Sequence, residues 1–259
     1  MTTPQSSEFD KQFATTLARG LELLRCFSPQ RPTLSNGELS ALTGLSRPTV
    51  SRFTYTLMKL GYLTQERRSG NYELGTAVVA LGYPLLANLA LRQAARPAMT
   101  KLAEQLEGSV SLGLRDRLNI VYLETSRGRS TLSNRVSDIG MSHPIVATAI
   151  GRAYLCACTP EERSALINEC KVKTPELWKC HEAAVNESIA GFGTRRFCVS
   201  LGDLRPDIHA VAVPLRRTPN AEIAVFNCVV QAFQLRAGEL ENDLGPRLLA
   251  MVQSLELMV

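Results

Sequence analysis

Between residues 36 and 60, apolar and polar positions repeat with the period of an α-helix, and the repeat is interrupted once. Leu39, Leu42 and Leu45 predict the inner face of a first helix. Gly44 stands where the chain must reverse, and glycine readily adopts the positive φ that ends a helix. We therefore predict a helix, a tight turn and a second helix, around which the rest of the chain is organised.

The second helix is expected to have one apolar and one polar face. Ser46 is placed to cap it, and Pro48 falls in its first turn, where a missing N–H costs little. Its apolar stripe consists of Val50, Phe53, Leu57 and Leu60. The opposite face carries groups that phosphates and base edges accept, namely Arg47, Ser51, Arg52, Tyr55, Thr56 and Lys59.

A basic hairpin is predicted after this helix. Strand-like runs at 62–64 and 72–74 enclose a turn that contains Arg67 and Arg68. A polar, basic helix followed by a basic hairpin suits docking in a major groove, so the pattern indicates a winged helix-turn-helix that binds DNA. Because such shapes also occur in proteins that never touch nucleic acid, a role in assembly alone stays open.

Two helices are expected to flank this motif. The first carries Leu17, Leu21, Leu24 and Phe27 inward and ends before Pro29. The second spans 76–91, and its apolar positions exceed what a spacer needs: Val78, Leu81, Leu85, Leu86 and Leu89. We interpret it as a linker helix that packs against a second subunit, and packing on the neighbouring domain is an equal alternative.

From residue 92 onward, helical and strand-like patterns mix. Strands are predicted at 109–114, 120–124, 197–201, 208–215 and 223–233, and 126–144 is a long loop. Helices are predicted at 92–108, at 146–157, from a capping box at 159–162, from 174 to Gly191, and from Ala237. The second half is thus an α+β domain with an antiparallel sheet flanked by helices.

Composition narrows the class of protein. The 259 residues allow two modest domains, and a formal net charge of +5 fits an acidic partner. No apolar run reaches the ~18 residues of a membrane span, and the N-terminus lacks a signal peptide's apolar core. Seven cysteines without framework spacing suggest reduced thiols. We expect a cytoplasmic protein that does not enter a membrane.

The sequence offers little for catalysis or metal binding. The histidines are His143, His181 and His209, and they match no nucleophile motif. Asp203, Asp207 and His209 are near one another in sequence and could form an acid/base group. We favour instead a partly exposed polar edge or a set that orients a ligand. Cys156 and Cys158 would point about 200° apart on a helix and cannot share an ion. We expect no enzyme, no metal and no cofactor.

The chain resembles the IclR family of bacterial transcription regulators from about Thr15 to its C-terminus. The N-terminal half of the resemblance lies in LARGLELLRCF, LSRPTVSRFTYTLMKLGYL, NYELG and LGYPLLANLALRQAARPAMTKLAEQL. The C-terminal half lies in ATAIGRAYLC and AVAVPLRRTPNAEIAVFNCVV. LGY, LRQAARP, AVPLR and an Asn in the last strand look most like the branch that controls aromatic-acid catabolism, the protocatechuate and hydroxybenzoate regulators.

The resemblance implies a winged helix-turn-helix at 13–75, a linker helix that dimerises at 76–91, and a GAF-like effector-binding domain at 92–259. Such proteins are homodimers or dimers of dimers that bind a palindromic operator and respond to a small aromatic or carboxylate-bearing metabolite. By position, the DNA-binding residues are Arg47, Thr49, Ser51, Arg52, Tyr55, Arg67 and Arg68. The effector-binding residues are Ile139, Met141, Ala149, Ile150, Ser200, Ala210, Asn227 and Val229.

This chain departs from the family pattern around the effector cleft. Asp207 stands at a common glycine, Ala210 at a Cys or Ser position, and Asn227 and Val229 at frequent serines. Fewer hydroxyls and one added amide should select a different ligand, so effector identity does not carry over. The rival hypothesis is a metabolite-binding or enzymatic protein whose helix-turn-helix serves only assembly.

Overall fold

The protein is described here from a computed structural model that covers residues 12–128, 138–215 and 222–257. Contacts within the chain divide it into two units, Met1–Asn88 and Leu89–Val259. Each unit has its own hydrophobic core. In the described part of the chain, no single helix is long and apolar enough to cross a membrane.

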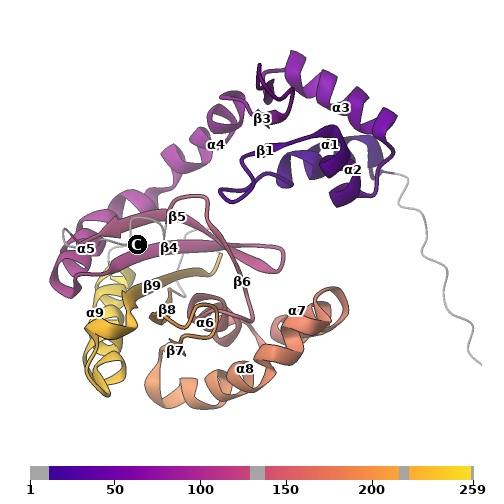
Figure 1. The fold of residues 1–259 in the computed structure, drawn as a ribbon. Helices are drawn as coiled ribbons and strands as arrows, with labels where there is room; N and C mark the ends of the chain where they lie inside the picture. The colour runs from indigo at the N-terminus through magenta and orange to yellow at the C-terminus, as the bar shows by residue number, and fades with distance from the viewer. Residues whose placement is uncertain (1–11, 129–137, 216–221, 258–259) are drawn as a thin grey trace, which may run out of the picture. The chain divides into compact units, whose positions relative to one another are not determined.

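The first unit is a winged helix-turn-helix followed by a helix. Its helices are α1 (Thr15–Arg25), α2 (Asn36–Thr43), α3 (Arg47–Lys59) and α4 (Ala77–Asn88). Its strands β1 (Thr33–Leu34), β2 (Leu63–Gln65) and β3 (Tyr72–Leu74) form an antiparallel sheet in the order β1-β3-β2 (Figure 1). The helices and sheet enclose a small core of Leu23, Phe27, Leu34, Leu39, Val50 and Leu63.

Several predicted core positions of this unit are wrong. Leu17 and Leu21 are 64% and 49% exposed, because α1 buries Leu23 instead. Phe27, which was also predicted to face inward, is buried just after the helix. A helix with leucines at 17, 21, 23 and 24 offers two adjacent stripes, and periodicity alone does not choose between them. Leu42, at the end of the short helix α2, is 47% exposed. Leu60 is exposed because α3 ends one residue before it.

The second unit is a sheet covered by helices on both faces, which confirms the predicted α+β class. Six antiparallel strands run in the order β6-β5-β4-β9-β8-β7. They are β4 (Ser109–Asp116), β5 (Asn119–Arg127), β6 (Ser142–Pro144), β7 (Cys198–Leu201), β8 (Ile208–Leu215) and β9 (Ala224–Gln231). One face packs against α5 (Ala90–Leu106) and α9 (Gly245–Glu256), and the other against α6 (Ala149–Ala157) and α8 (Pro175–Arg195), while α7 (Pro160–Lys173) packs on α8 (Figure 1).

Strict alternation along the central strands creates the two cores. On β9, Phe226 and Cys228 face α5 and α9, whereas Val225 and Val229 face α6. Asn227 lies on the α6 face between those two valines, and it is only 2% exposed. An amide at an apolar, buried strand position requires hydrogen-bonding partners. This face of the sheet therefore contains polar interactions in addition to its apolar packing.

Several boundaries in the second unit differ from those predicted. The hairpin strands β4 and β5 are longer than expected, so the loop predicted at 126–144 begins after β5 and ends at β6; residues 129–137 of it lie outside the described residues. Helix α6 begins at Ala149 because the Thr148 side chain caps it, accepting a hydrogen bond from the Gly151 N–H.

The two last predicted helix boundaries are also wrong. Helix α8 continues through Gly191 to Arg195, since glycine weakens a helix interior without ending it. The final α-helix begins at Gly245 rather than Ala237, after a π-helical turn at Leu240–Leu244. Pro246 has no N–H to donate and is best tolerated in a first helical turn, so the regular helix starts there.

Candidate DNA-binding and effector sites

The turn between α2 and α3 is fixed by local hydrogen bonds. Ser35 and Glu38 form a reciprocal capping box, and the hydrogen bonds from Ser35 lower the pKa of the Glu38 carboxyl. Gly44 adopts φ 69°, the left-handed conformation expected at the reversal. The Asn36 amide donates to the Ser51 hydroxyl over 2.9 Å and ties the start of α2 to α3. The orientation of α3 is therefore built into the motif.

The predicted DNA-binding residues of α3 lie mainly on its exposed face. Arg47, Ser51, Arg52 and Tyr55 are exposed, and the Tyr55 ring lies 5.5 Å from the Lys59 ammonium. Thr49 is only half-buried, and its hydroxyl is 2.8 Å from that of Ser46 in the first turn. The face that points away from the core thus presents hydroxyls, guanidinium groups and an aromatic ring.

The wing extends this basic surface. Arg67 and Arg68 are exposed in the turn between β2 and β3. Within the described residues, no carboxylate forms an ion pair with Arg47, Arg52, Arg67 or Arg68. Four guanidinium groups whose charge is not neutralised by the protein suit a polyanionic partner.

A cavity of about 70 Å³ lies between the N-terminus of α6 and the sheet. Six of the eight predicted effector-binding residues line it: Ala149, Ile150, Ser200, Ala210, Asn227 and Val229. The other two do not. Ile139 is 40% exposed, and Met141 packs at the edge of the core on this face of the sheet. The structure gathers most of the predicted site, and the ligand-binding role of these residues stays a prediction.

The cavity has polar atoms that the protein leaves without a partner. The Asn227 amide nitrogen donates to the Tyr122 hydroxyl over 2.7 Å, while its Oδ1 is buried and has no partner among the described residues. His143 Nε2 is likewise buried and without a partner in the described part of the chain. Burial lowers the pKa of His143, so its imidazole is neutral near pH 7. The cavity therefore presents one hydrogen-bond acceptor, Asn227 Oδ1, and one neutral imidazole, His143, that the described residues leave unsatisfied.

Sequence reasoning missed half of the residues around this cavity. They are Tyr122, His143, Thr148, Leu204, Arg205 and Ile208. Strand alternation was a usable signal for Ile208, which lies two positions before Ala210 on β8. Leu204 and Arg205 come from the connection between β7 and β8, whose course has no periodic signature in the sequence.

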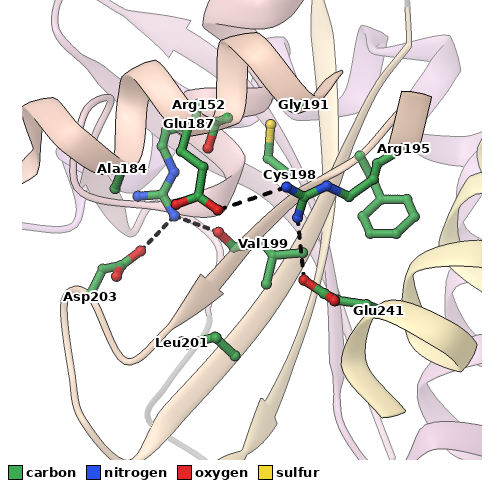
Figure 2. A pocket seen from close by; sticks show the side chains of 12 residues that line it. Arg152, Ala184, Glu187, Gly191, Arg195, Cys198, Val199, Leu201, Asp203 and Glu241 are labelled. Atoms are coloured by element: carbon green, nitrogen blue, oxygen red, sulfur yellow. Dashed lines mark hydrogen bonds and ion pairs between the residues drawn. The ribbon is translucent and has the colours of Figure 1, made fainter. Parts of the chain in front are cut away.

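A second cavity, of about 120 Å³, is lined by residues of α6, α8 and β7 (Figure 2). Arg152 of α6 enters it and forms an ion pair with Asp203, with Nη2 and Oδ2 2.5 Å apart. Arg195 of α8 pairs with Glu241 at 3.3 Å and with Glu187 at 3.8 Å. The charged side chains of this second cavity are therefore largely paired with one another. Because Asp203 is engaged in such a pair, an acid/base group of Asp203, Asp207 and His209 is not favoured.

The other residues considered for catalysis or metal binding, Asp207 and the cysteines, have structural roles. Asp207 pairs with Arg205, and hydrogen bonding from Arg205 lowers the pKa of the Asp207 carboxyl. Cys156 and Cys198 lie with their sulfurs 3.7 Å apart, and the hydrogen bond with Cys156, together with burial, raises the pKa of Cys198. Burial raises the pKa of Cys158 to about 11. Such thiols stay protonated at neutral pH and are poor nucleophiles or metal ligands.

Comparison with known proteins identifies the two units. Residues 16–67 match the IclR helix-turn-helix domain, and residues 84–256 match the family described as bacterial transcriptional regulator IclR C-terminal. The chain belongs to the IclR family. It is 33% identical to the HTH-type transcriptional regulator TsaQ1/TsaQ2 of Comamonas testosteroni, over 98% of this chain and 92% of that protein.

Other IclR-family relatives include regulators of aromatic catabolism, as the sequence resemblance indicated. The Pca regulon regulatory protein of Pseudomonas putida is 26% identical over 95% of this chain and 84% of its own length. The p-hydroxybenzoate hydroxylase transcriptional activator of Acinetobacter baylyi is 26% identical over 95% of this chain and 92% of its own. These relatives are named regulators rather than enzymes, and the TsaQ1/TsaQ2 regulator is more similar to this chain than either.

Solved IclR-family structures share the fold. The crystal structure of an IclR family transcriptional regulator from Brucella abortus has a TM-score of 0.88 and 40% identity, covering 99% of this chain and 97% of that one. An IclR homolog from Microbacterium hydrocarbonoxydans, complexed with 4-hydroxybenzoate, has a TM-score of 0.69 and 20% identity, over 93% and 96% of the two chains. The IclR-family chain is therefore a DNA-binding transcriptional regulator.

Proposed function

We propose that this regulator reads operator DNA through α3 and the wing, and that an aromatic or carboxylate-bearing metabolite in the α6 cavity controls that binding. The single observation that carries the proposal is a pair of buried polar atoms at the predicted effector site, Asn227 Oδ1 and His143 Nε2, for which the described residues provide no hydrogen-bond partner. Burying an unsatisfied polar atom costs about 1–3 kcal/mol, so a ligand that satisfies both gains affinity.

The cavity chemistry favours a hydroxylated acid. Asn227 Oδ1 accepts a hydrogen bond from a ligand hydroxyl, which in turn accepts one from the neutral imidazole when Nε2 carries the proton. A carboxylate suits the N-terminal end of α6 at the cavity wall, and it suits Arg205 if the ligand shares or replaces the Asp207 carboxylate that this guanidinium now binds. The 4-hydroxybenzoate bound by the Microbacterium homolog has both groups, which makes that compound a suitable first probe.

Ligand entry requires the cavity to widen. Its volume is about 70 Å³, roughly half of the ~150 Å³ that accommodates benzene in an engineered protein cavity. Two arrangements of the domain are therefore expected, one closed and one open, and the effector favours the open one. Only a ligand whose affinity differs between the two arrangements shifts their populations.

Dimers, or dimers of dimers, are the proposed functional form, and they act on palindromic operators in the cytoplasm. Two copies of α3 would then enter successive major grooves, and a two-fold protein reads a two-fold site. Helix α4 supports this assembly because it contains no buried residue, although it is strongly apolar. Its exposed apolar side chains are Val79, Leu81, Tyr83 and Leu85.

The proposal is tested by a gel shift on the DNA upstream of the protein's own gene. 4-Hydroxybenzoate is compared with benzoate and 4-hydroxybenzyl alcohol, each of which lacks one of its polar groups. Specific binding that only 4-hydroxybenzoate alters supports the whole proposal. Specific DNA binding that responds to none of these compounds supports the DNA-binding role and rejects an aromatic acid of this kind as the effector. Loss of specific binding, with thermal stabilisation by a compound, favours the rival in which the helix-turn-helix serves only assembly.

A further inference from the structure

Two walls of the effector cavity are joined by one ion pair, between a buried arginine and a partly exposed aspartate. The first wall is the start of α6, with Ala149 and Ile150. The second is the β7–β8 hairpin, with Ser200 on β7 and Leu204 in the connection. Arg152 lies two residues after Ile150 on α6, and Asp203 lies directly before Leu204. The ion pair therefore bridges the walls that an entering ligand must separate.

The hydrogen bonds of the Arg152 guanidinium go to this hairpin. Its Nη2 donates to the Val199 carbonyl over 2.6 Å and to Asp203 Oδ2 over 2.5 Å (Figure 2). Arg152 is 1% exposed, and its Nε and Nη1 have no partner among the described residues. Loss of the carboxylate would leave a buried guanidinium charge uncompensated, and loss of the carbonyl would leave a buried N–H without an acceptor. Both contacts are therefore costly to break.

Strand β7 is an edge strand, so it has no second strand to hold it in place. It pairs only with β8 in the described sheet, and the Val199 carbonyl bonds to Arg152 instead of to another strand. Ser200 lines the effector cavity, whereas Cys198, Val199 and Leu201 line the second cavity, so β7 contributes a wall to both. Movement of β7 away from α6 would enlarge the effector cavity directly.

We propose that the Arg152–Asp203 ion pair is a latch that holds the effector cavity closed and sets the rate at which ligand enters and leaves. Arg152 and Asp203 are positioning residues, since neither lines the effector cavity itself. This inference rests on the proposed effector site. When the latch opens, the β7–β8 hairpin separates from α6, and ligand binding stabilises the separated state.

Hydrogen exchange of the full-length protein without ligand tests the latch, so this test does not depend on knowing the effector. Asp203→Asn is expected to increase exchange of the backbone amides of 199–205 by roughly tenfold, because a hydrogen bond between charged groups is lost. The control is Asp207→Asn, which removes the exposed ion pair with Arg205 inside the same connection. That control should leave the β7 amides as protected as in the wild type.

Two further variants guard against general destabilisation. Asp203→Glu keeps the carboxylate and should restore most of the protection. The double variant Arg152→Met with Asp203→Asn leaves no buried unpaired charge and should still show fast exchange confined to β7 and its connection. Wild-type protection in Asp203→Asn and in the double variant would overturn the latch, and so would a uniform increase across the whole unit in both.

Ligand kinetics provide the second readout, with 4-hydroxybenzoate as the probe. In stopped-flow experiments, Asp203→Asn should increase both association and dissociation rates by roughly tenfold, since each passes through the opened cavity. Unchanged rates in a variant whose β7 exchanges faster would overturn the gating role. If the wild type binds no 4-hydroxybenzoate, that effector assignment fails, and the exchange experiment still decides the latch.

Discussion

Asn227 and Tyr122 are joined by a 2.7 Å hydrogen bond, although β4 lies between the strands that carry them. The bond crosses the α6 face of the sheet, from β9 to β5. It gives the amide nitrogen a partner, while Oδ1 is buried beside the cavity and has no partner among the described residues. The sheet thus fixes a hydrogen-bond acceptor in the wall of the proposed effector site.

Asn227→Leu should abolish the effector response and leave operator binding intact. Leucine fills a similar volume but cannot accept a ligand hydrogen bond, and it leaves Tyr122 without the amide as donor. We expect a loss of unfolding free energy of about 1–3 kcal/mol and at least a tenfold weaker effect of 4-hydroxybenzoate in the gel shift. A normal response in this variant would move the effector site elsewhere.

Much of this architecture was predictable from sequence, and the reasons are local. The α2–turn–α3 motif has the signals Gly44, Ser46 and Pro48 within a few residues, and strand β8 was predicted at its observed bounds because its alternation is clear. Failures occurred where a signal was ambiguous or absent. Leucines at adjacent positions left the phase of α1 undecided, and a helix-tolerated glycine was mistaken for the end of α8.

The candidate site was predictable only in part, because it is made by tertiary contacts. The family resemblance placed Asn227 and Val229 by strand position, and those positions line the cavity. Tyr122 and His143 come from the other edge of the sheet, more than 80 residues away in sequence, and no spacing rule links them to Asn227. The partner of Arg152 was equally hidden, since Asp203 lies in an irregular connection.

Arg52→Ala should weaken DNA binding irrespective of sequence and reduce its salt dependence. Arg52 is exposed on α3 and forms no ion pair within the described chain, so a phosphate contact is its expected role. Loss of one such contact lowers the slope of log K against log salt by about 0.9. The matched control is Arg96→Ala, an exposed arginine on α5 in the other unit. A slope unchanged from wild type would remove Arg52 from the interface.

Gly151→Ala should severely destabilise the effector unit, whereas Gly193→Ala should not. A Cβ at Gly151 would lie 2.1 Å from the Ile145 carbonyl oxygen, so α6 must move away from backbone that cannot yield. At Gly193, inside α8, the same atom meets nothing within 4 Å. We expect a loss of more than about 2 kcal/mol for the first change and a gain of about 0.5–1 kcal/mol for the second. Chemical denaturation measures both, and equal effects would contradict the tight contact.

The stability of the effector unit should fall as the pH drops below 6.5, partly through His143. Burial lowers its pKa from the ordinary value of 6.5, so the unfolded chain takes up a proton at a higher pH than the folded chain does. The stabilising difference is complete above pH 6.5 and is lost as the pH falls toward the folded pKa. Burial also lowers the pKa of His181, which adds to the effect.

His143→Gln should therefore reduce, without removing, the decline in thermal stability between pH 7.5 and pH 5. Glutamine keeps a polar side chain at the cavity and does not titrate. Thermal unfolding midpoints at several pH values make the comparison, with the wild type under the same buffers. The same decline in both proteins would show that His143 is protonated equally in the folded and unfolded states.

Comparison of Val79→Asp with Val172→Asp tests whether the exposed apolar face of α4 forms a subunit interface. Val79 on α4 is 75% exposed and Val172 on α7 is 79% exposed, so the single chain offers no reason for them to differ. Burial of a valine side chain contributes about 1.5–3 kcal/mol, and an introduced carboxylate opposes burial further. If α4 forms the proposed dimer, Val79→Asp should weaken self-association by at least roughly tenfold in sedimentation experiments, while Val172→Asp leaves it unchanged.

Operator affinity should also fall with Val79→Asp, because two linked DNA-binding units bind a palindromic operator far more tightly than one unit does. A Val79→Asp protein that stays fully dimeric would place the subunit contacts outside α4.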